Sequence, residues 1–147
     1  MKFQLTSSPL ENLNLKNGLA AENAGGFCAF EGWVRNENQG REVIALEYEA
    51  FNELCATEAE KILNEAAHRF KIVDAHCFHR TGKLKIGDMA VWVGVTAAHR
   101  DETFKACRYI IDELKARLPI WKKEYYTDGE SEWLNGRGVS LEVRSTR

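Results

Sequence analysis

Three features of the 147-residue sequence predict a single α+β domain. Segments that alternate apolar and polar residues are mixed along the chain with two long segments of helical spacing, and hairpin-like turns separate several of them. The apolar fraction of 44% is sufficient for a core, and no internal repeat or linker marks a second domain. We therefore expect a mixed or antiparallel sheet with two long helices over residues 1–147, in which about 137–147 form a mobile tail.

The first elements are expected to be a strand, a helix and a second strand. KFQLT alternates as a strand, and SSPLENLNL predicts a helix with Ser8 as its cap, Pro9 at the first helical position and Glu11 completing a capping box. GFCAFEGWVR reads as an apolar strand in which Gly32 indicates a bulge or a close backbone approach. NENQGRE then predicts a polar loop.

The middle of the chain predicts a strand and the first long helix. VIALEYEAF is the clearest strand, because Ile44, Leu46 and Tyr48 alternate with glutamates. A helix should occupy about 52–70. Its expected core residues are Leu54, Ile62, Leu63, Ala66 and Phe70.

Two further strands and the second long helix should follow. KIVDAHCFHR predicts a strand, TGKLKIGD a turn region, and MAVWVGVTAAH a strand covered on both faces. The second helix is expected over about 101–118, and Pro119 ends it. Its apolar stripe consists of Phe104, Cys107, Ile111, Leu114 and Leu118. IWKKEYY then predicts a short strand, TDGE a turn and SEWL a final extended segment.

Composition narrows the class of protein. The net charge of −2 gives no general attraction to nucleic acid. No apolar run approaches the roughly 20 residues of a membrane span, and the first residues lack the apolar block of a signal peptide, so we expect a cytoplasmic protein. Four scattered cysteines without a C-x-x-C pattern are expected to be buried thiols.

Two groups of cations are candidate anion sites. His99 and Arg100 stand where a strand ends and a helix begins, and the amides of a helix start favour an anion there. The alternative is that Asp101 caps the helix and both residues are ordinary surface residues. Arg35, which enters a polar loop, is expected either to bind an anion or to pair with Glu37.

The second group lies around the segment ARLPIWKKEYY. Lys115 flanks the apolar stripe of its helix, while Lys122 and Lys123 should point to opposite faces of a strand. One of these two lysines is expected to face solvent and the other a pocket. A partly buried lysine near other cations has a lowered pKa, which suits proton transfer or nucleophilic work; ordinary solvated lysines are the alternative.

No metal or cofactor motif emerges. His76 and His79 would face opposite sides of a strand, which argues against a zinc site. The chain has no dinucleotide fingerprint, no Walker A loop and no G-x-S-x-G elbow. The residues alone therefore support an α+β domain with anion-binding options, and no cofactor.

Taken together, several segments resemble the catalytic (large) subunit of molybdopterin synthase. The matching segments run in the family's order over roughly residues 25–134: FEGWVRNENQG, VIALEYEAF, HRTGKLKIGD, VGVTAAHR, IIDELKARLPIWKKE and DGESEW. The resemblance implies an α/β hammerhead fold and a sulfurtransferase of molybdenum cofactor biosynthesis. Such enzymes make the dithiolene of molybdopterin from cyclic pyranopterin monophosphate. The sulfur is a thiocarboxylate on the carboxyl-terminal Gly-Gly of a small ubiquitin-like subunit. The resemblance also implies a homodimer that binds two small subunits as a heterotetramer.

The resemblance also implies which residues form the site. Lys115 and Lys122 match the family's catalytic segments, with Lys115 acting as acid/base or transiently holding the partner's carbonyl. The implied substrate-binding residues are Trp33, Val34, Arg35, His99, Arg100, Lys115, Lys122, Lys123, Glu124 and, more loosely, Arg137.

One consequence is geometric. Lys115 follows Asp101 by 14 residues, which is roughly 20 Å along a helix, too far for both ends to grip one small substrate. We therefore expect a composite site in a dimer, with His99 and Arg100 supplied by the neighbouring chain. Two rival functions remain: a non-catalytic adaptor for a ubiquitin-like tail, and an unrelated phosphate-ester enzyme.

Overall fold

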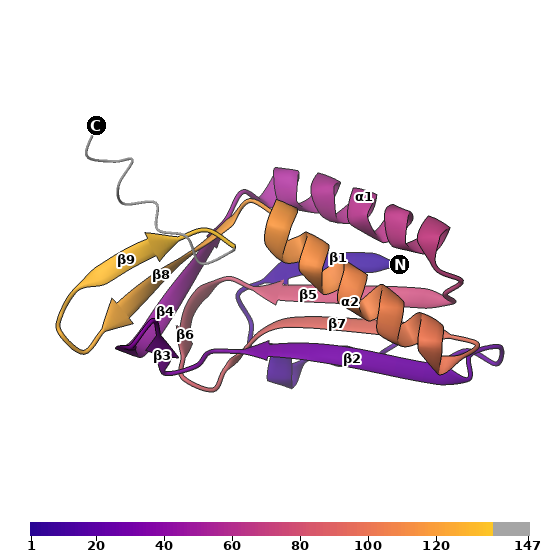
Figure 1. Ribbon diagram of the computed structural model, residues 1–147, viewed down its shortest axis with the longest axis horizontal. Coiled ribbons are helices and arrows are strands. Elements are labelled where there is room, and N and C mark those ends of the chain that lie inside the picture. Colours follow the sequence, from indigo (N-terminus) through magenta and orange to yellow (C-terminus); the bar gives the residue numbers. More distant parts are fainter. Residues whose placement is uncertain (137–147) are drawn as a thin grey trace.

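The computed structural model describes residues 1–136 as two sheets and two long helices (Figure 1). The first sheet has the strand order β1 (Lys2–Thr6), β5 (Asp74–Arg80), β7 (Met89–Ala97) and β2 (Gly26–Trp33). β1 and β5 run parallel, whereas the other neighbours are antiparallel. This arrangement confirms the expected α+β class.

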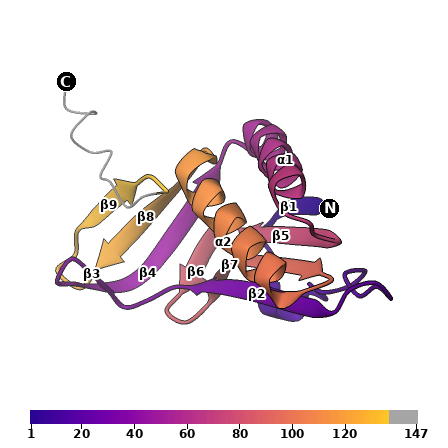
Figure 2. The same cartoon turned by 45° about the vertical axis from the view of Figure 1, so that its right-hand side comes forward.

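The second sheet stands to one side of the helices (Figures 1 and 2). Its order is β3 (Glu37–Asn38), β4 (Arg41–Ala50), β8 (Ile120–Tyr126) and β9 (Ser131–Leu134), and β6 (Gly82–Lys85) also pairs with β4. The polar loop expected at 36–42 is instead a tight hairpin, because Gln39 and Gly40 both have positive φ between β3 and β4. The expected turn region 81–88 likewise contains a strand, β6.

Helices α1 (Asn52–Arg69) and α2 (Arg100–Arg117) cover one face of the first sheet. Their positions agree with the sequence, but two of the expected core residues are wrong: Leu54 and Phe104 are 53% and 57% exposed. Small neighbours, Cys55 in α1 and Thr103 in α2, occupy the core positions instead and allow the helices to lie close to the sheet. Within residues 1–136, no helix has both the length and the apolar character that a membrane crossing requires.

Strand β7 is buried along its whole length, as expected. The helices cover one of its faces, and the segment after β1 covers the other through Leu10, Leu15 and Leu19. The helix expected in this segment is wrong, since only a 3₁₀ turn, Leu10–Asn12, forms. Ser8 does not cap it, and the Glu11 carboxylate accepts the Met89 amide at 2.7 Å instead of forming a capping box. Packing against β7 therefore outweighs the local helix signal.

Irregular strand positions shape the junction between the sheets. Gly32 lies at a bulge in β2, as expected, and a methyl group there would approach the Val91 side chain to 2.6 Å. A second irregularity in β4, between Val43 and Ala45, turns Ile44 outward, so its expected inward position is wrong. Val43 is buried in its place.

Candidate active site

A cavity of about 460 Å³, including its open mouth, lies where the carboxyl end of α2 meets both sheets. Two further cavities adjoin it, one toward the end of β2 and one toward the β3–β4 turn. Among the described residues, only Lys115 and Lys122 line all three. Two lysines that the sequence separates by a proline and a change of element are therefore brought together.

The alternation of β8 explains the position of Lys122. Ile120, Lys122, Glu124 and Tyr126 share the inward face of the strand, where Lys122 pairs in register with Tyr48 of β4. Lys123 points to the other face, with its amine over the rings of Tyr125 and Trp133, at 5.3 and 5.7 Å. Lys122 therefore faces a pocket, as one of the two was expected to do, whereas Lys123 is half-buried over two aromatic rings and does not simply face solvent.

Lys115 reaches the cavity from the last turn of α2, with no ion pair among the described residues. Desolvation lowers the pKa of its amine, and the neighbouring Lys122 ammonium lowers the pKa further. A lysine with a lowered pKa loses its proton more readily and can act as a base or a nucleophile.

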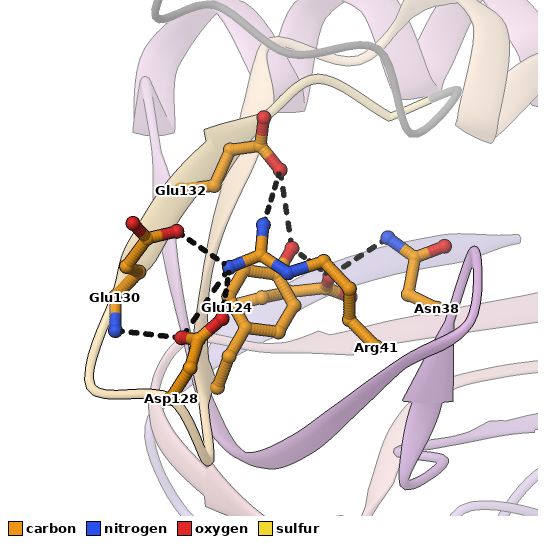
Figure 3. Close-up of polar contacts among 7 residues, drawn as sticks. Asn38, Arg41, Glu124, Asp128, Glu130 and Glu132 are labelled. Atoms are coloured by element: carbon orange, nitrogen blue, oxygen red, sulfur yellow. Dashed lines mark hydrogen bonds and ion pairs between the residues drawn. The ribbon is translucent and has the colours of Figure 1, made fainter.

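Lys122 has different surroundings, because its amine lies 3.4 Å from the Glu124 carboxylate. Glu124 is only 4% exposed. Its Oε1 accepts hydrogen bonds from Asn38 Nδ2 at 2.8 Å and from the Tyr126 hydroxyl at 2.9 Å (Figure 3). Lys122 thus has an anionic partner, which Lys115 lacks among the described residues. The two lysines of the cavity therefore have different electrostatic surroundings.

His79 and Tyr48 also line the cavity, although sequence reasoning gave neither a role. His79 Nδ1 lies 2.8 Å from the Arg80 carbonyl, which can only accept, so this nitrogen carries the proton. Burial lowers the pKa of His79 to about 4, so the ring is neutral. It packs edge-on against Tyr48, whose pKa burial raises to about 12. The alternation of β5, which places His79 on the same face as the buried Cys77, was the signal that could have identified it.

The predicted residues at the end of β2 line the cavity on that side, called the second cavity below. Trp33 is 67% exposed, with its indole N–H donating to Glu31 at 2.9 Å, whereas Val34 is buried. Arg35 is exposed and has neither a hydrogen bond nor an ion pair among the described residues. The alternative of an Arg35–Glu37 pair is wrong, because Glu37 accepts the Gly40 amide at 2.7 Å.

His99 and Arg100 lie apart from this group, at the amino end of α2 beside a separate cavity. Lys115 is 16 residues beyond His99, about 24 Å along a straight helix, so one chain does not bring the two ends together. The alternative role of Asp101 as cap is wrong: His99 holds the cap position, without a side-chain hydrogen bond, and Asp101 pairs with Lys105 at 2.9 Å. Arg137 lies outside the described residues.

No cysteine lines the three cavities. Cys55, Cys77 and Cys107 are buried and Cys28 is half-buried, and all four are free thiols. Burial raises the pKa of Cys55 to about 11 and that of Cys107 to about 12, so these thiols stay protonated at neutral pH. Among residues 1–136, no three His, Cys, Asp or Glu side chains are grouped to hold a metal ion. The three cavities therefore offer the amines of Lys115 and Lys122, the Arg35 guanidinium and several carboxylates, beside the rings of His79 and Tyr48.

Comparisons with known proteins agree with this geometry. Residues 5–117 match the family described as MoaE protein. The molybdopterin synthase catalytic subunit of Pyrococcus abyssi is 44% identical over 138 residues, which cover 92% of each chain. The crystal structure of molybdopterin synthase from Staphylococcus aureus superposes with a TM-score of 0.85 at 31% identity, covering 92% of this chain and 98% of that one. The complex of subunits 1 and 2 of the molybdopterin-converting factor from Helicobacter pylori, at 21% identity and a TM-score of 0.73, shares the fold. It covers 97% of this chain and 91% of that one.

Proposed function

The chain belongs to the MoaE protein family and functions as a catalytic subunit of molybdopterin synthase, a sulfurtransferase, and we propose that Lys115 and Lys122 carry out the transfer in the cavity that they share. The sulfur donor is the carboxyl-terminal thiocarboxylate of a small ubiquitin-like subunit, and the acceptor is cyclic pyranopterin monophosphate. The observation that carries the assignment of residues is that these two lysines line all three adjoining cavities.

The two lysines have different roles in this proposal. Lys122, whose ammonium is paired with Glu124, attracts the anionic groups of the donor tail and the substrate. Lys115, whose pKa is lowered, moves protons as the sulfur attacks, or transiently holds the carbonyl that the sulfur leaves. Arg35 binds the anionic part of the substrate at the rim, beside Trp33 and Val34. A second thiocarboxylated partner supplies the second sulfur, so no cysteine of this chain is needed.

The remaining predicted cations reach the site only when two chains assemble as a dimer. His99 and Arg100 of the neighbouring chain complete the site in a homodimer, which binds two small subunits as a heterotetramer. Lys123 and Arg137 stay hypothetical contributors to substrate binding. We place the reaction in the cytoplasm, where thiols and thiocarboxylates persist in reduced form.

The test uses the purified chain, the pterin precursor and a thiocarboxylated partner subunit. Dithiolene formation by the wild-type protein and its loss in Lys115→Ala are the expected results. Normal dithiolene formation by Lys115→Ala would refute the role of this lysine. An adaptor without catalytic function would bind the partner's tail but not the pterin, so pterin binding by the chain alone separates the two functions.

A further inference from the structure

Glu124 and Glu132 lie directly opposite each other in the β8–β9 ladder. Like charges in this position repel and destabilise a strand pair. Here the hydroxyl of Tyr126 lies between them, 2.9 Å from Glu124 Oε1 and 3.1 Å from Glu132 Oε1. The Tyr126 hydroxyl has one proton to donate and two carboxylates within hydrogen-bonding distance. The carboxylate that accepts this proton is the one whose position the tyrosine fixes.

Arg41 gives Glu132 a second partner, which Glu124 does not share. Its guanidinium stacks 3.6 Å from the centre of the Tyr126 ring and pairs with Asp128 at 3.1 Å and Glu130 at 2.9 Å. It also lies 4.0 Å from Glu132 (Figure 3). The outer carboxylates thus have the Arg41 guanidinium, whereas Oε1 of the buried Glu124 depends on the neutral donors Tyr126 and Asn38. Desolvation, together with the two nearby carboxylates, raises the pKa of Tyr126, so its hydroxyl remains a donor.

The hydrogen bonds of Glu124 fix the direction of its second oxygen. Oε1 accepts from both Tyr126 and Asn38, and Oε2 faces the Lys122 amine at 3.4 Å. Among the described residues, Glu124 is the one carboxylate that pairs with Lys122. A long, flexible lysine side chain is placed by such a partner, since the amine has no geometry of its own.

We propose that Tyr126 is a positioning residue for the sulfur transfer: its hydroxyl fixes Glu124, and Glu124 in turn positions Lys122. The effect on catalysis depends on the proposed function of the cavity, whereas the effect on the position of Lys122 does not. Tyr126 itself does not line any of the three cavities, so it acts through Glu124.

The direct test is the mobility of the Lys122 side chain, followed by NMR relaxation of ε-labelled lysines in the intact chain and assigned with Lys122→Arg. Tyr126→Phe loosens the Glu124 carboxylate, so the order parameter of the Lys122 ε-carbon should fall. The matched control is Tyr125→Phe, because that hydroxyl donates to Glu47 at 3.2 Å on the opposite face of β8. An unchanged mobility of the Lys122 side chain in Tyr126→Phe, or an equal change in the control, overturns the proposal.

A double-mutant cycle measures whether Tyr126 acts through Glu124. Tyr126→Phe should lower kcat for dithiolene formation by about tenfold, the effect of one hydrogen bond to a charged group, and should cause no further loss in a Glu124→Gln background. Equal losses in both backgrounds contradict the proposal. Should Tyr126→Phe not fold, as judged by circular dichroism, Asn38→Ala replaces it, because it removes the other donor to the same oxygen. A wild-type protein without sulfur transfer would refute the proposed function, and the mobility of the Lys122 side chain would still decide this inference.

Discussion

Lys115 and Lys122 line the same cavities, but within residues 1–136 only Lys122 has a carboxylate beside it, Glu124 Oε2 at 3.4 Å. This difference in surroundings indicates different roles for two lysines that the sequence alone does not distinguish. A paired ammonium suits the binding of anions, whereas an amine whose pKa is lowered suits proton transfer. The substitutions below test this division one group at a time.

Replacing Lys115 should remove the acid/base or nucleophilic group. We expect Lys115→Ala to slow dithiolene formation at least about 100-fold, the lower range for loss of a general acid or base, with tail binding largely retained. Single-turnover assays with thiocarboxylated partner measure this loss. Lys105→Ala is the matched control, because Lys105 lies on the same helix, pairs with Asp101 and lines none of the three cavities. Comparable losses in both variants would contradict a specific role.

The charge of Lys122 should set the titration of Lys115. The nearby ammonium disfavours a second positive charge and lowers the pKa of Lys115, so Lys122→Gln should raise that pKa toward its ordinary value. Because the amine of Lys115 is neutral only above its pKa, the acidic limb of the rate–pH profile should move to higher pH. Lys122→Arg keeps the charge and should leave this limb in place. A limb that does not move in Lys122→Gln would show that the two amines are not coupled.

Arg35 should contribute to binding of the pterin substrate more than to the sulfur transfer itself. It is exposed beside the second cavity and has no protein partner among the described residues, so its guanidinium is available to an anionic substrate. We expect Arg35→Ala to raise KM for the pterin by about tenfold, the value of one hydrogen bond to a charged group, with kcat nearly unchanged. Arg108→Ala, on the exposed face of α2, is the control. A fall in kcat with unchanged KM would contradict a binding role.

The sequence predicted the elements that carry the site better than the site itself. β8 and the end of α2 followed from alternation, helical spacing and Pro119, and these signals also placed Lys122 on one face and Lys123 on the other. The support of Lys122 was only partly predictable: alternation within β8 places Tyr126 on the face of Glu124, whereas Asn38 meets Glu124 only because β3, β4 and β8 pair in the second sheet. Leu54 and Phe104 were assigned to the core because hydrophobicity alone does not show that Cys55 and Thr103 pack there.

The junction of the two helices predicts a specific acid sensitivity. Arg117 bonds Glu65 at 2.6 Å and Glu58 at 2.9 Å, and this hydrogen bonding lowers the pKa of Glu65 to about 2. A lowered carboxylate pKa stabilises the fold fully above the ordinary value of 4.5, and the stabilisation is lost as the pH falls to about 2. Arg117→Gln should therefore lower Tm at neutral pH and flatten its decline over this range. Arg108→Gln, which loses an exposed pair with Asp112, should leave the decline unchanged.

The composite site can be tested by complementation between inactive chains. His99 and Arg100 lie at the opposite end of α2 from Lys115, so a site that uses both ends must combine two chains.

In a heterodimer of Lys115→Ala with Arg100→Ala, one site carries both substitutions and the other carries neither. Doubly tagged, co-expressed heterodimers should therefore recover about half of the wild-type rate per dimer, while each homodimer stays inactive. A heterodimer of Lys115→Ala with Lys122→Ala should recover nothing, because one chain supplies both lysines to a site and each site then loses one of them. If the Lys115→Ala/Arg100→Ala heterodimer is no faster than the Lys115→Ala/Lys122→Ala heterodimer, Arg100 and Lys115 do not meet across a dimer.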